Sequence, residues 1–112
     1  MLAIGIGLAH SYLGEKYILT RLFLQPLPKL FGSDHFTRQT LRFAWHILTI
    51  AWFGLAAILF LLYLGEPSRS SLLNVVGATF AITGIIGLIA SRGKHLSWVV
   101  FGTIATLCFV AA

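Results

Sequence analysis

The feature that most constrains this chain is the apolar run from Leu41 to Gly65, LRFAWHILTIAWFGLAAILFLLYLG. A run of about 20 apolar residues matches the hydrocarbon thickness of a bilayer, so it predicts a transmembrane helix. The run also contains His46. An ionisable side chain inside a membrane is costly and usually marks a functional site with a partner nearby. The positions of the other ionisable residues therefore decide what the chain can do.

Composition places the whole chain in the membrane class. Of its 112 residues, 58% are hydrophobic and 10% are charged, and a globule of this size could not bury so much apolar surface. We therefore expect the lipid bilayer as its partner. The net charge of +5 is spread over loops, without a basic run interleaved with aromatic residues, so we expect no nucleic-acid binding.

Proline and glycine divide the chain into four expected helices. Pro26 and Pro28 end the first helix, the turn at Gly65 ends the second, and the connection at Gly93 ends the third. The sequence predicts an all-α fold, a four-helix transmembrane bundle in a single domain 1–112, with helices at about 2–24, 36–64, 71–91 and 95–112.

Basic residues predict the orientation. All but Arg69 of the eight lysines and arginines lie at the end shared by the first two and the last two helices: Lys16, Arg21, Lys29, Arg38, Arg42, Arg92 and Lys94. Because cytoplasmic loops carry the excess of positive charge in membrane proteins, we expect both termini to be periplasmic.

Small residues along the third helix predict close helix packing. At helical spacing they share one side, and such faces let two membrane helices approach closely. They are Asn74, Gly77, Ala78, Ala81, Gly84 and Ser91.

Helical periodicity turns one histidine inward on each of three helices. At about 100° per residue, one arc of the first helix holds Gly7, His10, Ser11, Gly14, Glu15 and Arg21. One face of the second holds Gln39, Arg42, His46, Thr49, Phe53 and Ala57. One face of the fourth holds His95, Val99, Gly102, Thr106 and Phe109. Glu15, His46 and His95 fall at compatible depths near the basic end, whereas His10 lies about 7.5 Å deeper than Glu15.

This set of side chains predicts a metal or haem site. Imidazole and carboxylate together suit zinc, iron, manganese or copper, and a bundle core can supply them from facing helices. The expected metal ligands are His10, Glu15, His46 and His95. In the haem version, two histidines would ligate the iron of haem b, and Arg21, Arg38 and Arg42 would hold its propionates. Such a centre would support redox or hydrolytic chemistry.

Other interpretations of the same residues stay open. His46 would bond a backbone carbonyl or Thr49, His95 would start a helix, and Glu15 would pair with Arg42 or Arg21. The chain would then be a non-enzymatic accessory subunit of a larger membrane complex. Alternatively, Glu15 and the histidines would line a proton or ion pathway, which four helices would complete only as a homo-oligomer. No substrate or reaction follows from the sequence.

Three segments carry a resemblance. They are HSYLGEKYIL (10–19), LRFAWHILTIAWFGLAA (41–57) and SRGKHLSW (91–98). They resemble the pattern HSxxGE, LRxxWH and RGxHLSW of a family of small uncharacterised bacterial four-helix membrane proteins. The resemblance implies a multi-pass protein of the bacterial inner membrane. It draws attention to His10, Glu15, Arg42, His46 and His95, and implies neither an activity nor a cofactor.

Overall fold

The computed structural model describes residues 1–112 as an all-helical chain without strands. The first helix runs through α1 (Leu2–Leu13), the π-helix η1 (Gly14–Leu19) and α2 (Thr20–Leu22). It is followed by α3 (His35–Leu64), α4 (Arg69–Ser91) and α5 (Ser97–Ala111). The prediction of an all-helical chain with four helices is confirmed.

Two of these helices are long and apolar enough to cross a membrane. They are α3, with 30 residues, and α4, with 23 residues. The helix α5 is also apolar but has only 15 residues. By length and composition, the chain therefore has two candidate membrane-spanning helices.

The helix ends follow from local chemistry. At the start of α4, the Ser68 hydroxyl accepts a hydrogen bond from the Ser71 backbone N–H at 3.0 Å, which satisfies one of the donors that a helix N-terminus leaves free. At its end, Arg92 and Gly93 both adopt left-handed backbone conformations. Their N–H groups bond back to the carbonyls of the last turn, which terminates the helix.

Each pair of neighbouring helices approaches closely at a glycine. A Cβ at Gly7 would lie 3.2 Å from the Phe53 ring of α3, and one at Gly54 would overlap the Thr79 side chain of α4. A Cβ at Gly77 would lie 2.8 Å from the Phe109 ring of α5. Small residues let membrane helices pack closely. Of the small residues predicted to share a packing face on α4, Gly77 and Gly84 lie against α5, whereas Asn74 and Ala78 are exposed.

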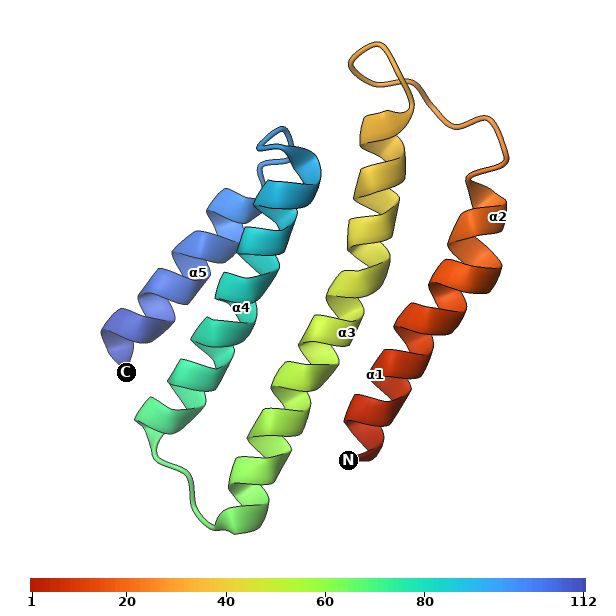
Figure 1. Cartoon of the computed structure of the whole chain (residues 1–112). Helices are drawn as coiled ribbons and strands as arrows, with labels where there is room; N and C mark the ends of the chain where they lie inside the picture. Colours follow the sequence, from red (N-terminus) through yellow and green to blue (C-terminus); the bar gives the residue numbers. More distant parts are fainter.

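The helices form a flat row, which corrects the expectation of a closed bundle. The first helix packs on α3, α3 on α4, and α4 on α5, with no other helix pair in contact (Figure 1). The molecule measures 50 × 30 × 14 Å, so its smallest dimension is close to the thickness of one helix.

Opposed contact faces explain the row. On α3, Thr49 meets the first helix and Gly54 meets α4, and the two residues lie about 140° apart around the helix. On α4, Thr79 meets α3 and Gly77 meets α5, about 160° apart. Because both central helices contact their neighbours on nearly opposite sides, the row does not close.

The two ends of the row differ in their connections. The segment 23–34 and the loop between α4 and α5 lie at one end, whereas both termini and the turn between α3 and α4 lie at the other (Figure 1). The basic residues of the connections, Lys29, Arg92 and Lys94, therefore share one end of the molecule.

A first prediction concerns the glycine-rich face of α4. The substitution Gly84→Leu should destabilise the protein by about 1–3 kcal/mol, a usual cost of overpacking, because a Cβ there already meets the α5 backbone at 3.4 Å. The matched control is Ala78→Leu, on the same helix but exposed. Thermal unfolding in detergent should separate the two variants, and equal melting temperatures would contradict the packing described here.

A second prediction concerns the loop before α3. A hydrogen bond from the Arg38 guanidinium holds the pKa of Asp34 below its ordinary value of 3.8. The pair therefore contributes stability above pH 3.8 and loses it as the pH falls through the lowered pKa of Asp34. Wild type should melt above the Asp34→Asn variant at pH 7, and the difference should vanish in more acidic solution. A difference that persists unchanged at low pH would show that the carboxylate charge is not its cause.

Candidate functional site

A cluster of polar side chains lies along the interface between the first helix and α3, which we call the seam. The first helix supplies Ser11 and Glu15, and α3 supplies Arg42, His46 and Thr49. These residues fall on the two arcs that helical periodicity predicts. We refer to these five residues as the seam cluster.

Glu15 and Arg42 form a two-pronged ion pair across the seam. Arg42 Nη2 lies 2.7 Å from Glu15 Oε1, and Arg42 Nε donates to Glu15 Oε2 at 3.1 Å. Both carboxylate oxygens are thus engaged, in the parallel geometry that makes arginine–carboxylate pairs strong and directional. Their side chains are 35% and 40% exposed, so the pair lies at an open edge of the seam.

His46 uses both of its ring nitrogens in the seam cluster. Its Nε2 lies 3.2 Å from Glu15 Oε2, and its Nδ1 lies 2.8 Å from the Ser11 hydroxyl. The imidazole therefore connects the ion pair on one side with a hydroxyl group on the other.

Two hydroxyl groups continue the chain of hydrogen bonds toward the middle of the row. Ser11 Oγ lies 2.6 Å from Thr49 Oγ1, and the Thr49 hydroxyl donates to the Gly7 carbonyl at 3.0 Å. Thr49 is buried. The chain therefore starts at the half-exposed carboxylate and ends at a backbone carbonyl inside the seam.

The number of available donors limits how the protons can be arranged along this chain of hydrogen bonds. Thr49 has one hydroxyl hydrogen and gives it to Gly7, so Ser11 must be the donor to Thr49. Ser11 then has no hydrogen left for His46, so His46 Nδ1–H is the donor in that bond. The other nitrogen, Nε2, faces a carboxylate oxygen that already accepts from Arg42. A carboxylate only accepts hydrogen bonds, so a hydrogen bond between His46 and an ionised Glu15 requires a proton on Nε2.

Glu15 lies in a π-helical turn of the first helix. The turn begins at Gly14, where a Cβ would overlap the Trp45 indole. Isolated π-helical turns inside α-helices often occur at functional sites. The isolated glycine is the only signal that the sequence offers for this turn.

His10 is held by Trp45 and does not join the seam cluster. The two rings are stacked with their centroids 4.6 Å apart. The His10 Nε2 lies 3.3 Å from the Trp45 carbonyl, and the Trp45 indole N–H donates to the His10 carbonyl at 3.1 Å. Trp45 therefore positions one of the predicted ligands.

His95 lies elsewhere, at the start of α5. Its Nδ1 accepts a hydrogen bond from the Ser97 backbone N–H at 3.3 Å, and its ring lies 6.2 Å from that of Phe36. This is the helix-start role that the sequence leaves open as an alternative. The separation has a simple cause, because α3 and α4 lie between α5 and the helix that carries Glu15.

Two of the three arginines proposed to hold haem propionates have other partners. Arg38 donates to Asp34 and to the Phe23 carbonyl, and Arg42 is paired with Glu15. Arg21 is exposed. The structure thus offers no set of free guanidinium groups around one position.

The predicted metal ligands do not converge in this arrangement. Only Glu15 and His46 meet, and no three His, Cys, Asp or Glu side chains are placed to hold one ion. The geometry gives no support to a four-ligand centre, and metal or haem binding stays a prediction.

No family model, curated protein or solved structure matches this chain. The family resemblance of the three sequence segments therefore also stays a prediction.

A third prediction tests the fit of Trp45 against the π-helical turn. The Gly14→Ala substitution must displace Trp45 and should cost about 1–3 kcal/mol. The matched control is Gly5→Ala on the same helix, where a Cβ meets nothing within 4 Å. Thermal unfolding and tryptophan fluorescence should both change for Gly14→Ala alone, and unchanged fluorescence would contradict the described contact.

Proposed function

We propose that this chain is a multi-pass protein of the bacterial inner membrane whose seam cluster binds and releases a proton. The observation that carries the proposal is that His46 is engaged through both ring nitrogens, one of them against a carboxylate. Histidine and carboxylate chains within membrane segments commonly serve as proton relays. The function best supported is therefore part of a proton pathway.

The exposure of apolar side chains supports the membrane placement. Only nine of the 112 residues are buried, and leucine, isoleucine and valine side chains are exposed along every helix. Exposed apolar surface on this scale is unfavourable in water, whereas lipid tails cover it without cost. We propose four crossings with both termini periplasmic, because the basic connections share one end and the basic end is normally cytoplasmic.

The geometry suggests how proton loss would act on the seam. Without its Nε2 proton, His46 would present a nitrogen lone pair to the carboxylate of Glu15. The two acceptors would repel, and Glu15 would stay with Arg42, whose charge is permanent. The His46 ring would then turn or move away from Glu15, so proton binding and the closure of the seam are coupled.

The open edge of the seam supports assembly with other chains. Glu15, Arg42 and His46 are each about one-third exposed or more in a layer one helix thick. Charged groups at membrane depth normally face a bundle interior or a water-filled cavity. We propose that another copy of this chain, or a subunit of a larger membrane complex, covers this edge.

A fourth prediction gives the direct test of the proton site. In protein labelled with ¹⁵N at histidine, NMR should show protons on both ring nitrogens of His46 while Glu15 is ionised, as judged by the infrared carboxylate band. The Glu15→Gln variant should lose this signature, because an amide does not hold the imidazolium charge. A bare nitrogen on His46 in the wild type, with Glu15 ionised, would overturn the assignment.

Proton transport and metal content provide a second test on the same purified protein. In vesicles containing a pH-sensitive dye, His46→Ala should reduce proton entry, whereas His35→Ala, at an exposed position, should not. Elemental analysis and an absorption spectrum complete the test. A stoichiometric metal or haem that is lost in His46→Ala would replace the proton site with the cofactor site predicted from the sequence.

A further inference from the structure

A second polar site lies at the basic end, outside the seam. A cavity of about 60 Å³ is lined by ten residues, of which four are hydrophobic. They come from the 23–34 segment, the first turns of α3, the last turn of α4 and the loop before α5. The polar members are Ser33, His35, Gln39, Ser91, Arg92 and Lys94. We call this cavity the basic pocket.

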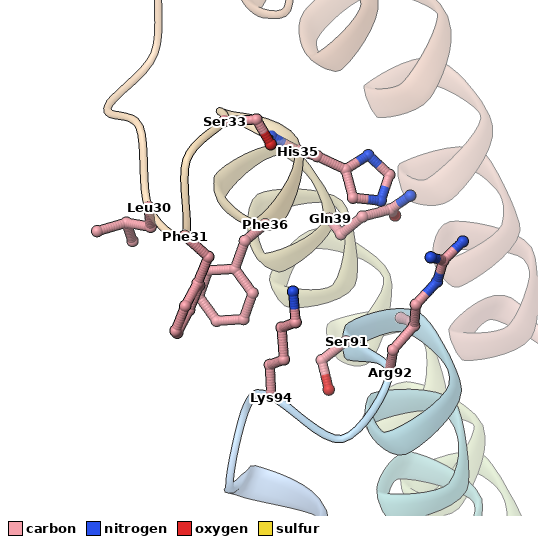
Figure 2. A pocket seen from close by; sticks show the side chains of 10 residues that line it. Leu30, Phe31, Ser33, His35, Phe36, Gln39, Ser91, Arg92 and Lys94 are labelled. Carbon is pink, nitrogen blue, oxygen red and sulfur yellow. The ribbon is translucent and has the colours of Figure 1, made fainter.

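The two cations of the basic pocket have no anionic partner in the chain. Arg92 and Lys94 extend from the loop after α4 toward the first turns of α3, where His35 and Gln39 project (Figure 2). The chain has three acidic residues. Glu15 and Asp34 are paired with Arg42 and Arg38, and Glu66 lies in the turn at the opposite end. The basic pocket is therefore a concentration of uncompensated positive charge.

Backbone strain is also concentrated at this pocket. Phe31 and Arg92 are the only two residues other than glycine with positive φ, at 56° and 50°, and both line the basic pocket. Side chains other than glycine adopt this conformation at a cost, and such strain tends to accumulate where a ligand is bound. Glycine is the usual residue at the position that Arg92 occupies at the end of α4. The strained backbone there carries a guanidinium group instead.

The remaining lining groups suit an anion. The Gln39 amide can donate two hydrogen bonds and the His35 ring one, beside the fork of Arg92 and the ammonium of Lys94. Lys94 Nζ also lies over the Phe31 ring at 5.2 Å, which fixes the position of its charge. Guanidinium and ammonium groups together are typical of sites that bind phosphate.

We propose that the basic pocket binds the phosphate group of an anionic phospholipid. Basic pockets between membrane helices on the cytoplasmic side recognise such headgroups. Leu30 and Phe31, which border the pocket, are 49% and 70% exposed, so apolar surface suited to an acyl chain adjoins the charges. Inorganic phosphate would present the same chemistry without that contact. The proposal rests on the proposed membrane placement and is independent of the proton site.

The experiment compares lipid binding by matched variants. The protein is placed in nanodiscs of phosphatidylcholine with increasing phosphatidylglycerol, and native mass spectrometry counts the bound phosphatidylglycerol. The Arg92→Gln/Lys94→Gln double variant should bind this lipid roughly tenfold to thirtyfold more weakly, since each basic residue contributes on the order of 1 kcal/mol. Lys16→Gln, which removes one exposed charge outside the pocket, should bind as the wild type does, and so should the His46→Ala variant.

The possible results distinguish a specific lipid site from a general attraction between the membrane and a basic protein. Selective loss in the double variant, with an unchanged melting temperature in phosphatidylcholine alone, supports the site. Equal binding by the double variant and Lys16→Gln would overturn it, because the attraction would then be a general one between the membrane and a basic protein. Inorganic phosphate is titrated separately in detergent. Binding of phosphate that is lost in the double variant, without selective lipid loss, would retain the phosphate site and overturn the lipid as its source.

Discussion

The carboxylate of Glu15 is the group on which the join between the first helix and α3 depends. It accepts from Arg42 and faces His46, so a single carboxylate contacts two residues of α3. The hydroxyl groups of Ser11 and Thr49 extend the same join to the Gly7 carbonyl, and close packing of Gly7 on Phe53 and of Gly14 on Trp45 completes it.

The flat row of helices leaves most of the chain's surface uncovered. Because α3 and α4 each contact their neighbours on nearly opposite sides, both broad surfaces of the molecule remain uncovered and few residues are buried. Packing within the chain is concentrated at glycines, where helix backbones approach closely. A chain of this shape depends on its surroundings, either lipid or other subunits, for most of its apolar contacts.

The two polar sites differ in how their charge is balanced. In the seam, Arg42 is paired with Glu15 and the hydrogen-bonding groups satisfy one another. In the basic pocket, Arg92 and Lys94 have no carboxylate partner. Their positive charge is therefore available to an anionic ligand. The first turns of α3 border both places, with Gln39 lining the pocket and Arg42 lying one turn further along.

The sequence by itself determined the relative positions of residues within each helix. Periodicity places Ser11 and Glu15 on one arc and Arg42, His46 and Thr49 on another, and the rise per residue brings Glu15 and His46 to similar depths. Both kinds of relation are local, because they depend only on helix geometry.

The tertiary structure alone decided which helices are neighbours. His95 has a suitable depth and face, yet α3 and α4 separate its helix from that of Glu15, because the glycine faces of α3 and α4 produce a row instead of a closed bundle. His10 lies on the correct arc, but the Trp45 ring stacks on it. Depth and facing direction do not specify lateral order, since that order depends on how complete helix surfaces fit together.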